Sequence, residues 1–147
     1  MSAADLVPGR VVPYRYLWAR ERRAGLVEGR KLRPCVVLFA DEETAPGSRI
    51  VGVLAVTHTP PDPDHPGSAI ELPATVKARL GLDDAPSWIV VSEFNRFTWP
   101  ESGYDLETLP DGRGSYGALS PGAFATVKEA VRELRRRRRI AGIDRDG

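Results

Sequence analysis

Two short apolar runs constrain the fold of this chain more than any other feature of its sequence. They cover residues 33–40 (RPCVVLFA) and 49–57 (RIVGVLAVT), and each has the length and the β-branched content of a strand. A short apolar run bounded by turn residues is typical of a strand buried in the middle of a sheet. The sequence therefore predicts two buried central strands, joined by a turn at 41–48.

The remaining segments predict a small β structure with helices added to it. The chain contains 14 Gly and 13 Pro, so turns are plentiful and an all-helical bundle is not expected. One amphipathic helix begins at Ser120 and Pro121, because Phe124, Val127 and Leu134 recur at helical spacing. Further strands are expected at 10–18, 68–72, 87–93 and 94–99, one short helix at 73–80, and loops at 19–32, 58–67 and 100–119. We expect a mainly β fold with α, in which a small curled antiparallel sheet or barrel carries the C-terminal helix.

Length and composition predict one domain over residues 1–147, with its core at 8–139 and a tail at 140–147. No apolar stretch is long enough to cross a membrane, and the first ten residues do not resemble a secretory signal. The single Cys35 lies inside an apolar run, so we expect a core thiol in a cytoplasmic protein rather than a disulfide. One Cys and two His lack the spacing of a metal site, and no cofactor motif is present, so neither a metal nor a cofactor is expected.

Charge is distributed unevenly along the chain, although the net charge is only +1. Residues 1–40 carry eight basic and three acidic groups, residues 41–112 carry four and thirteen, and residues 113–147 carry nine and four. Two basic ends can form a positive groove if the fold brings them together; the alternative is ordinary surface charge. The basic ends contain the loop residues Arg20, Arg22, Arg23, Arg30 and Lys31, and the run of arginines at 135–139.

The order of several short motifs resembles the MazF/PemK family of toxin–antitoxin toxins. Residues 8–12 (PGRVV) are followed by a basic loop, then by 33–38 (RPCVVL) and by a strand that ends at Thr57. The similarity continues through 70–72, 80–82, 88–93 and the C-terminal helix, and covers most of residues 8–135. Two loops, after Thr57 and between 100 and 118, are longer than in the compact family members.

The resemblance implies an SH3-like barrel, a homodimer, and a metal-independent endoribonuclease (an mRNA interferase) that cuts single-stranded RNA selectively. It also implies a cognate acidic antitoxin as partner. Carried over residue by residue, it places Arg33 at the phosphate and Thr57 beside it. Position 58 is usually small in the family, so the resemblance gives His58 no role.

RNA cleavage by side chains alone needs a base for the 2′-hydroxyl and a cation at the phosphate. Arg33 suits the second role, because a guanidinium binds two phosphate oxygens and stays charged; the alternative is an arginine that anchors its own loop. Thr57 either donates to the phosphate or bonds to its own backbone. The base is left open between His58 and Glu93. The alternative for Glu93 is a salt bridge with Arg33 or with Arg96.

RNA binding is assigned to Trp18, as a stacking platform at a loop edge, and to the basic loop residues Arg20, Arg22, Arg23, Arg30 and Lys31. The arginine run at 135–139 either contacts the RNA backbone or forms a solvated helix end. Two rival functions remain at this stage: a growth inhibitor without nuclease activity, of the gyrase-poison type, and an inactive binding module on the same barrel.

Overall fold

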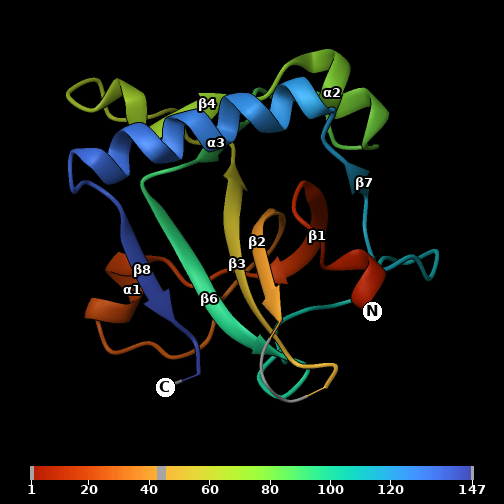
Figure 1. Cartoon of the computed structure of the whole chain (residues 1–147). Coiled ribbons are helices and arrows are strands. Elements are labelled where there is room, and N and C mark those ends of the chain that lie inside the picture. Colours follow the sequence, from red (N-terminus) through yellow and green to blue (C-terminus); the bar gives the residue numbers. More distant parts are fainter. Residues whose placement is uncertain (1, 43–45, 147) are drawn as a thin grey trace.

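Eight strands form a mainly antiparallel sheet that curls into a half-barrel (Figure 1). The structure is a computed structural model that describes residues 2–42 and 46–146. Its strands are β1 (Arg10–Arg15), β2 (Leu32–Glu42), β3 (Arg49–Thr57), β4 (Ala69–Glu71), β5 (Trp88–Val90), β6 (Glu93–Trp99), β7 (Gly117–Ala118) and β8 (Ala141–Asp144). Its helices are α1 (Ala19–Arg23), α2 (Ala74–Arg79) and α3 (Pro121–Arg136), with short 3₁₀ turns at Ala3–Asp5 and Pro66–Ser68. The predicted fold class is confirmed.

The two predicted central strands are β2 and β3, and they pair antiparallel with Cys35 opposite Ala55. β3 branches the sheet, because its first residues pair with β6 and its last residues pair with β5. The path then runs β4-β5-β3-β2-β1-β7. A register shift in β2 between Val37 and Phe39 adds to the curl, since a bulge bends a strand and increases its twist.

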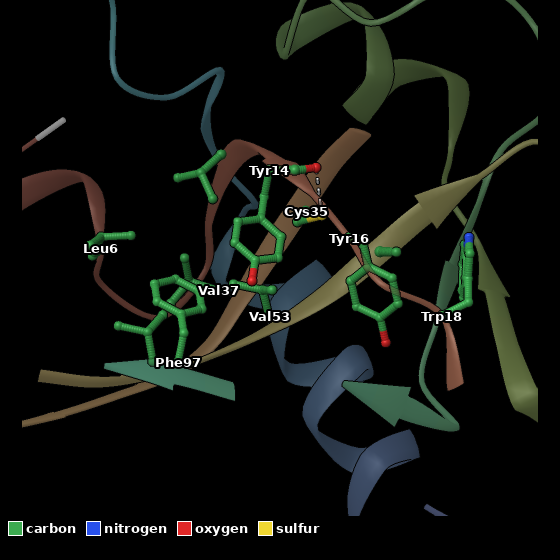
Figure 2. Close-up of a cluster of buried hydrophobic side chains, with 11 residues drawn as sticks. Leu6, Tyr14, Tyr16, Trp18, Cys35, Val37, Val53 and Phe97 are labelled. Carbon is green, nitrogen blue, oxygen red and sulfur yellow. Dashed lines mark hydrogen bonds between the residues drawn. The ribbon is translucent and has the colours of Figure 1, made fainter. Parts of the chain in front are cut away.

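Alternating residues of β2 and β3 build two apolar layers. Val37 and Val53 face the inside of the curl, where the Tyr14 and Phe97 rings stack with centroids 5.0 Å apart (Figure 2). Cys35 is completely buried in the same layer, as expected, and burial raises the pKa of its thiol. Their sequence neighbours build a second layer on the other face of the sheet.

The second layer is covered by α3, whose predicted start and apolar face are confirmed. The Ser120 hydroxyl oxygen accepts a hydrogen bond from the Ala123 N–H at 3.2 Å, and Pro121 occupies the first helical turn. Phe124, Val127, Val131 and Leu134 pack against the sheet. The helix ends at Arg136, and the five arginines at 135–139 are all exposed.

Two segments differ from expectation. The first turn of the predicted loop at 19–32 is the helix α1, which the Glu21 carboxylate caps by accepting the Trp18 N–H at 3.1 Å. The predicted tail at 140–147 contains β8, which runs parallel to β6. Beyond β8, the Arg145 side chain is buried, so the fold continues past residue 139. The half-barrel therefore has two short internal helices, α1 and α2, rather than one.

The fold brings residues from the two ends of the chain together. α1 lies beside β8 (Figure 1), and the Arg22 guanidinium donates to the backbone oxygen of Asp144 at 2.9 Å. Within the described residues, no helix combines the length and the apolar character needed to cross a membrane.

Candidate functional site

Arg33 lies at the start of β2, between two adjoining cavities of about 310 and 360 Å³. Thr57, at the end of β3, lines both cavities as well. We call the smaller one the His58 cavity and the larger one the Glu93 cavity, after the candidate base that each contains. The four residues predicted as catalytic are therefore brought together around Arg33.

The Arg33 guanidinium makes no hydrogen bond or ion pair within the described part of the protein. Its Nε is buried and has no hydrogen-bond partner among the described residues. Arg33 lies over the Trp18 ring, 5.2 Å from its centroid, and Arg20 lies 5.0 Å from the same ring. Burial, and then the positive charge of Arg20, lower the pKa of Arg33. In the described part of the chain, neither of these two arginines has a carboxylate within ion-pair distance. Two unpaired cations on one indole form a site that attracts an anion.

Trp18 has a different place from the one expected. Its side chain is buried, with 6% of its surface exposed, and the two guanidinium groups lie against its ring. The ring also contacts Tyr16 edge-on, at 4.8 Å between centroids. The indole thus holds Arg20 and Arg33 at the cavity, and it does not present a free face on which a base could stack.

Thr57 adopts the local hydrogen bond that we considered as the alternative. Its Oγ1 accepts the Thr59 N–H at 3.2 Å, and its side chain is mostly buried. The hydroxyl proton is not used by this bond. Thr57 therefore remains able to donate into either cavity beside Arg33.

His58 forms a pair with a carboxylate that lies 25 positions away in the sequence. Its Nε2 lies 2.9 Å from Oδ2 and 3.2 Å from Oδ1 of Asp83. An ionised carboxylate only accepts, so Nε2 carries the proton, and Nδ1 is the basic nitrogen of the neutral ring. Asp83 is fixed from the other side by the buried Lys77, whose Nζ donates to it at 3.1 Å and also to the backbone oxygen of Ala85. The hydrogen bond from Lys77, helped by His58, lowers the pKa of Asp83 and keeps it ionised.

Glu93 is committed to structural hydrogen bonds. Its Oε1 accepts from the Tyr16 hydroxyl at 3.1 Å and from the Ala19 N–H at 2.9 Å. These bonds tie the start of α1 to β6. The salt bridge that we considered for Glu93, with Arg33 or with Arg96, is not formed, and Arg96 pairs instead with two acidic residues near the C-terminus.

The predicted RNA-binding residues fall into two groups. Arg20 lines the Glu93 cavity and Lys31 lines the His58 cavity. Arg22 is held by the backbone of β8, and Arg30 lies 3.9 Å from the Glu21 carboxylate. Arg23 is exposed and does not line either cavity.

Three residues of the site were not predicted: Lys77, Asp83 and Tyr116. All are close to or line the His58 cavity, and burial raises the pKa of Tyr116. The only sequence signal for Asp83 is its place in a loop after a predicted helix, which does not reveal its partner. Within residues 2–42 and 46–146, no three His, Cys, Asp or Glu side chains are grouped as metal ligands would be.

Comparisons with known proteins found no matching family model, no matching curated protein and no matching solved structure.

Proposed function

We propose that this protein is an endoribonuclease that cuts single-stranded mRNA and acts as the toxin of a toxin–antitoxin pair. The observation that carries the proposal is the Arg33 guanidinium, which has an unsatisfied buried Nε and faces the cavity that contains the His58–Asp83 pair. Phosphate binding and proton removal are thereby available at one place. The sequence resemblance supports the same activity.

In the proposed reaction, the ribose 2′-hydroxyl attacks the adjacent phosphorus, and its proton passes to Nδ1 of His58. Arg33 binds the non-bridging phosphate oxygens, and Thr57 donates a hydrogen bond to them. The bond from phosphorus to the 5′ oxygen then breaks, and that oxygen takes a proton from water. The hydroxide left by that water takes the proton back from His58. The products are a 2′,3′-cyclic phosphate and a 5′-hydroxyl, so the step consumes no water and no other group.

We assign the base to His58 rather than to Glu93. His58 has a ring nitrogen not used by Asp83 and an anionic partner for its protonated form, whereas Glu93 holds the start of α1 in place through two hydrogen bonds. Asp83 is a positioning residue: it sets the tautomer of His58 and stabilises the imidazolium that forms.

The decisive experiment uses the purified protein and naked RNA, without ribosomes. Arg33→Ala should remain folded and lose about 100-fold or more in cleavage rate, because a cation at developing charge is removed. Arg33→Lys should recover part of the rate, since it restores charge but not the two-pronged geometry. Arg113→Ala is the matched control, because Arg113 makes an exposed pair with Asp111 outside both cavities.

Cleavage by folded Arg33→Ala at the parental rate would falsify the proposal. Growth arrest by a protein that leaves naked RNA intact would instead favour the rival non-nucleolytic inhibitor.

The assignment of the base is tested separately. His58→Ala should lower the rate by about 100-fold or more, while Glu93→Gln should lower it far less. Asp83→Asn should lower the rate, but by less than His58→Ala, because the ring keeps its basic nitrogen and loses only the partner that orients it. A full loss with Glu93→Gln, combined with an active His58→Ala protein, would reverse the assignment.

We also propose that a cognate acidic antitoxin covers the basic residues at the two cavities, and that the toxin is a homodimer. Arg20 and Lys31 support the first part, because they line the two cavities beside Arg33. An acidic antitoxin peptide should compete with RNA for Arg20 and Lys31. Tight peptide binding that leaves RNA affinity unchanged would exclude a shared site.

A further inference from the structure

A third hollow, of about 630 Å³, adjoins the Glu93 cavity on the side of the proline-rich loop. Asp62, Ser68 and Ser92 line both spaces, so the hollow continues the groove that begins at the His58 cavity. Its far wall is formed by Arg137 and Arg139, which follow the end of α3. A groove of three joined hollows suits an extended chain better than a single compact ligand.

The two arginines of this wall are not equivalent. The Arg137 Nε donates to Glu133 at 2.8 Å, so this guanidinium is already engaged with a carboxylate. Arg139 has no ion-pair partner among the described residues, and its N–H is fixed by a hydrogen bond to the Leu134 oxygen at 2.8 Å. Arg139 is therefore the guanidinium of the hollow that is available to a phosphate.

The hollow also contains acceptors that suit a nucleobase. Asp62 and Asp64 lie on its loop wall, and Oδ1 of Asp62 accepts the Asp64 N–H at 2.9 Å. Their other carboxylate oxygens can accept from the amino or imino groups of a base. A nucleotide uses both parts of this lining, because its base can donate to the carboxylates and its phosphate can be bound by Arg139.

We propose that this hollow binds the nucleotide that flanks the cleaved bond, with Arg139 on its phosphate. The inference rests on the proposed function, since it extends the RNA path from Arg33 toward the end of α3. Of the five consecutive arginines at 135–139, the proposal assigns a phosphate contact to Arg139 and none to Arg135.

The test measures the affinity for single-stranded RNA at several salt concentrations, using an oligonucleotide with a 2′-deoxy sugar at the cleavage site so that it is bound but not cut. Arg139→Gln should make the slope of log affinity against log salt shallower by about 0.7, the value for one lost phosphate contact on a single strand. Arg135→Gln is the matched control, because Arg135 is also exposed but does not line the hollow. It should leave the slope unchanged. Circular dichroism of both variants checks that each is folded.

Equal slopes for the two variants would overturn the proposal. So would weaker binding of an acidic peptide by Arg139→Gln with RNA binding intact, because the hollow would then serve a protein partner. The Arg33→Ala experiment separates this failure from failure of the proposed function. If Arg33→Ala loses cleavage while Arg139→Gln keeps the parental salt slope, the protein is still a nuclease, and only the third hollow is removed from the RNA path.

Discussion

Replacing Arg145 tests whether the C-terminal segment is part of the folded core. The Arg145 Nη1 donates to the Tyr14 hydroxyl at 3.0 Å and to the Arg15 backbone oxygen and Asn95 Oδ1, both at 3.1 Å. Its Nη2 pairs with the Asp105 carboxylate. The exposed fractions of the two charged side chains are only 7% and 19%. Arg145→Met keeps an unbranched apolar stem, shorter than that of arginine, and removes all of these bonds.

The size of the loss follows from the burial of the pair. Breaking one partner of a buried ion pair costs about 3–5 kcal/mol, because the other charge stays buried. A cavity of about 280 Å³ beside Asp105 admits water to its carboxylate, so we expect the lower end, about 3 kcal/mol. For a chain of this size, such a loss lowers Tm by roughly 6–12 °C.

Urea unfolding followed by circular dichroism measures the free energy of unfolding directly. Arg113→Met is the control, because the Arg113–Asp111 pair is more than half exposed on both sides, and its loss should leave the free energy of unfolding nearly unchanged. The double variant with Asp105→Asn should be less destabilised than the sum of its single variants, since it removes the unpaired charge. A loss below about 1 kcal/mol for Arg145→Met, or strict additivity in the double variant, would show that the reasoning from burial is wrong.

Three further predictions concern the fold. Burial raises the pKa values of Tyr16 and Cys35 above their ordinary values of 10.0 and 9.0, so these groups ionise at lower pH in the unfolded chain than in the folded one. The Tm should therefore fall as the pH rises through and beyond 9. An unchanged Tm up to pH 11 would contradict this. Gly29→Ala should lower Tm, because a Cβ there would lie 2.1 Å from the backbone oxygen of Arg15; a parental Tm would show that the loop shifts freely. Ser120→Ala should cost about 1 kcal/mol in urea unfolding through loss of the N-cap of α3, whereas Ser120→Asp should be nearly neutral.

The sequence predicted those parts of the fold that depend on local pattern. The apolar runs that became β2 and β3 predict strands because their β-branched residues recur without polar interruption. The helix α3 is predicted by Ser120, Pro121 and its apolar spacing. α1 was missed because its N-cap position holds Trp18, whose side chain does not accept a hydrogen bond as a typical capping side chain does. The Glu21 carboxylate accepts the Trp18 N–H instead.

The missed parts of the site depend on contacts between distant segments. Arg33 and Thr57 could be proposed because each lies at the end of a predicted strand, and the structure places both in the same two cavities. The partner of His58 could not be predicted, because nothing local to Asp83 or Lys77 indicates that the loop after α2 returns to the end of β3. β8 was missed for the same reason: a short parallel strand is specified by its neighbour, here β6, more than by its own residues.

The proline-rich loop between β3 and β4 also affects the entropy of binding. Its prolines at positions 60, 61, 63 and 66 fix four φ angles, and the His65 N–H donates to the Asp62 oxygen at 2.8 Å. This loop forms walls of both the Glu93 cavity and the third hollow. Because the loop is already ordered, little conformational freedom is lost when a ligand enters the groove, and more of the contact energy remains as affinity.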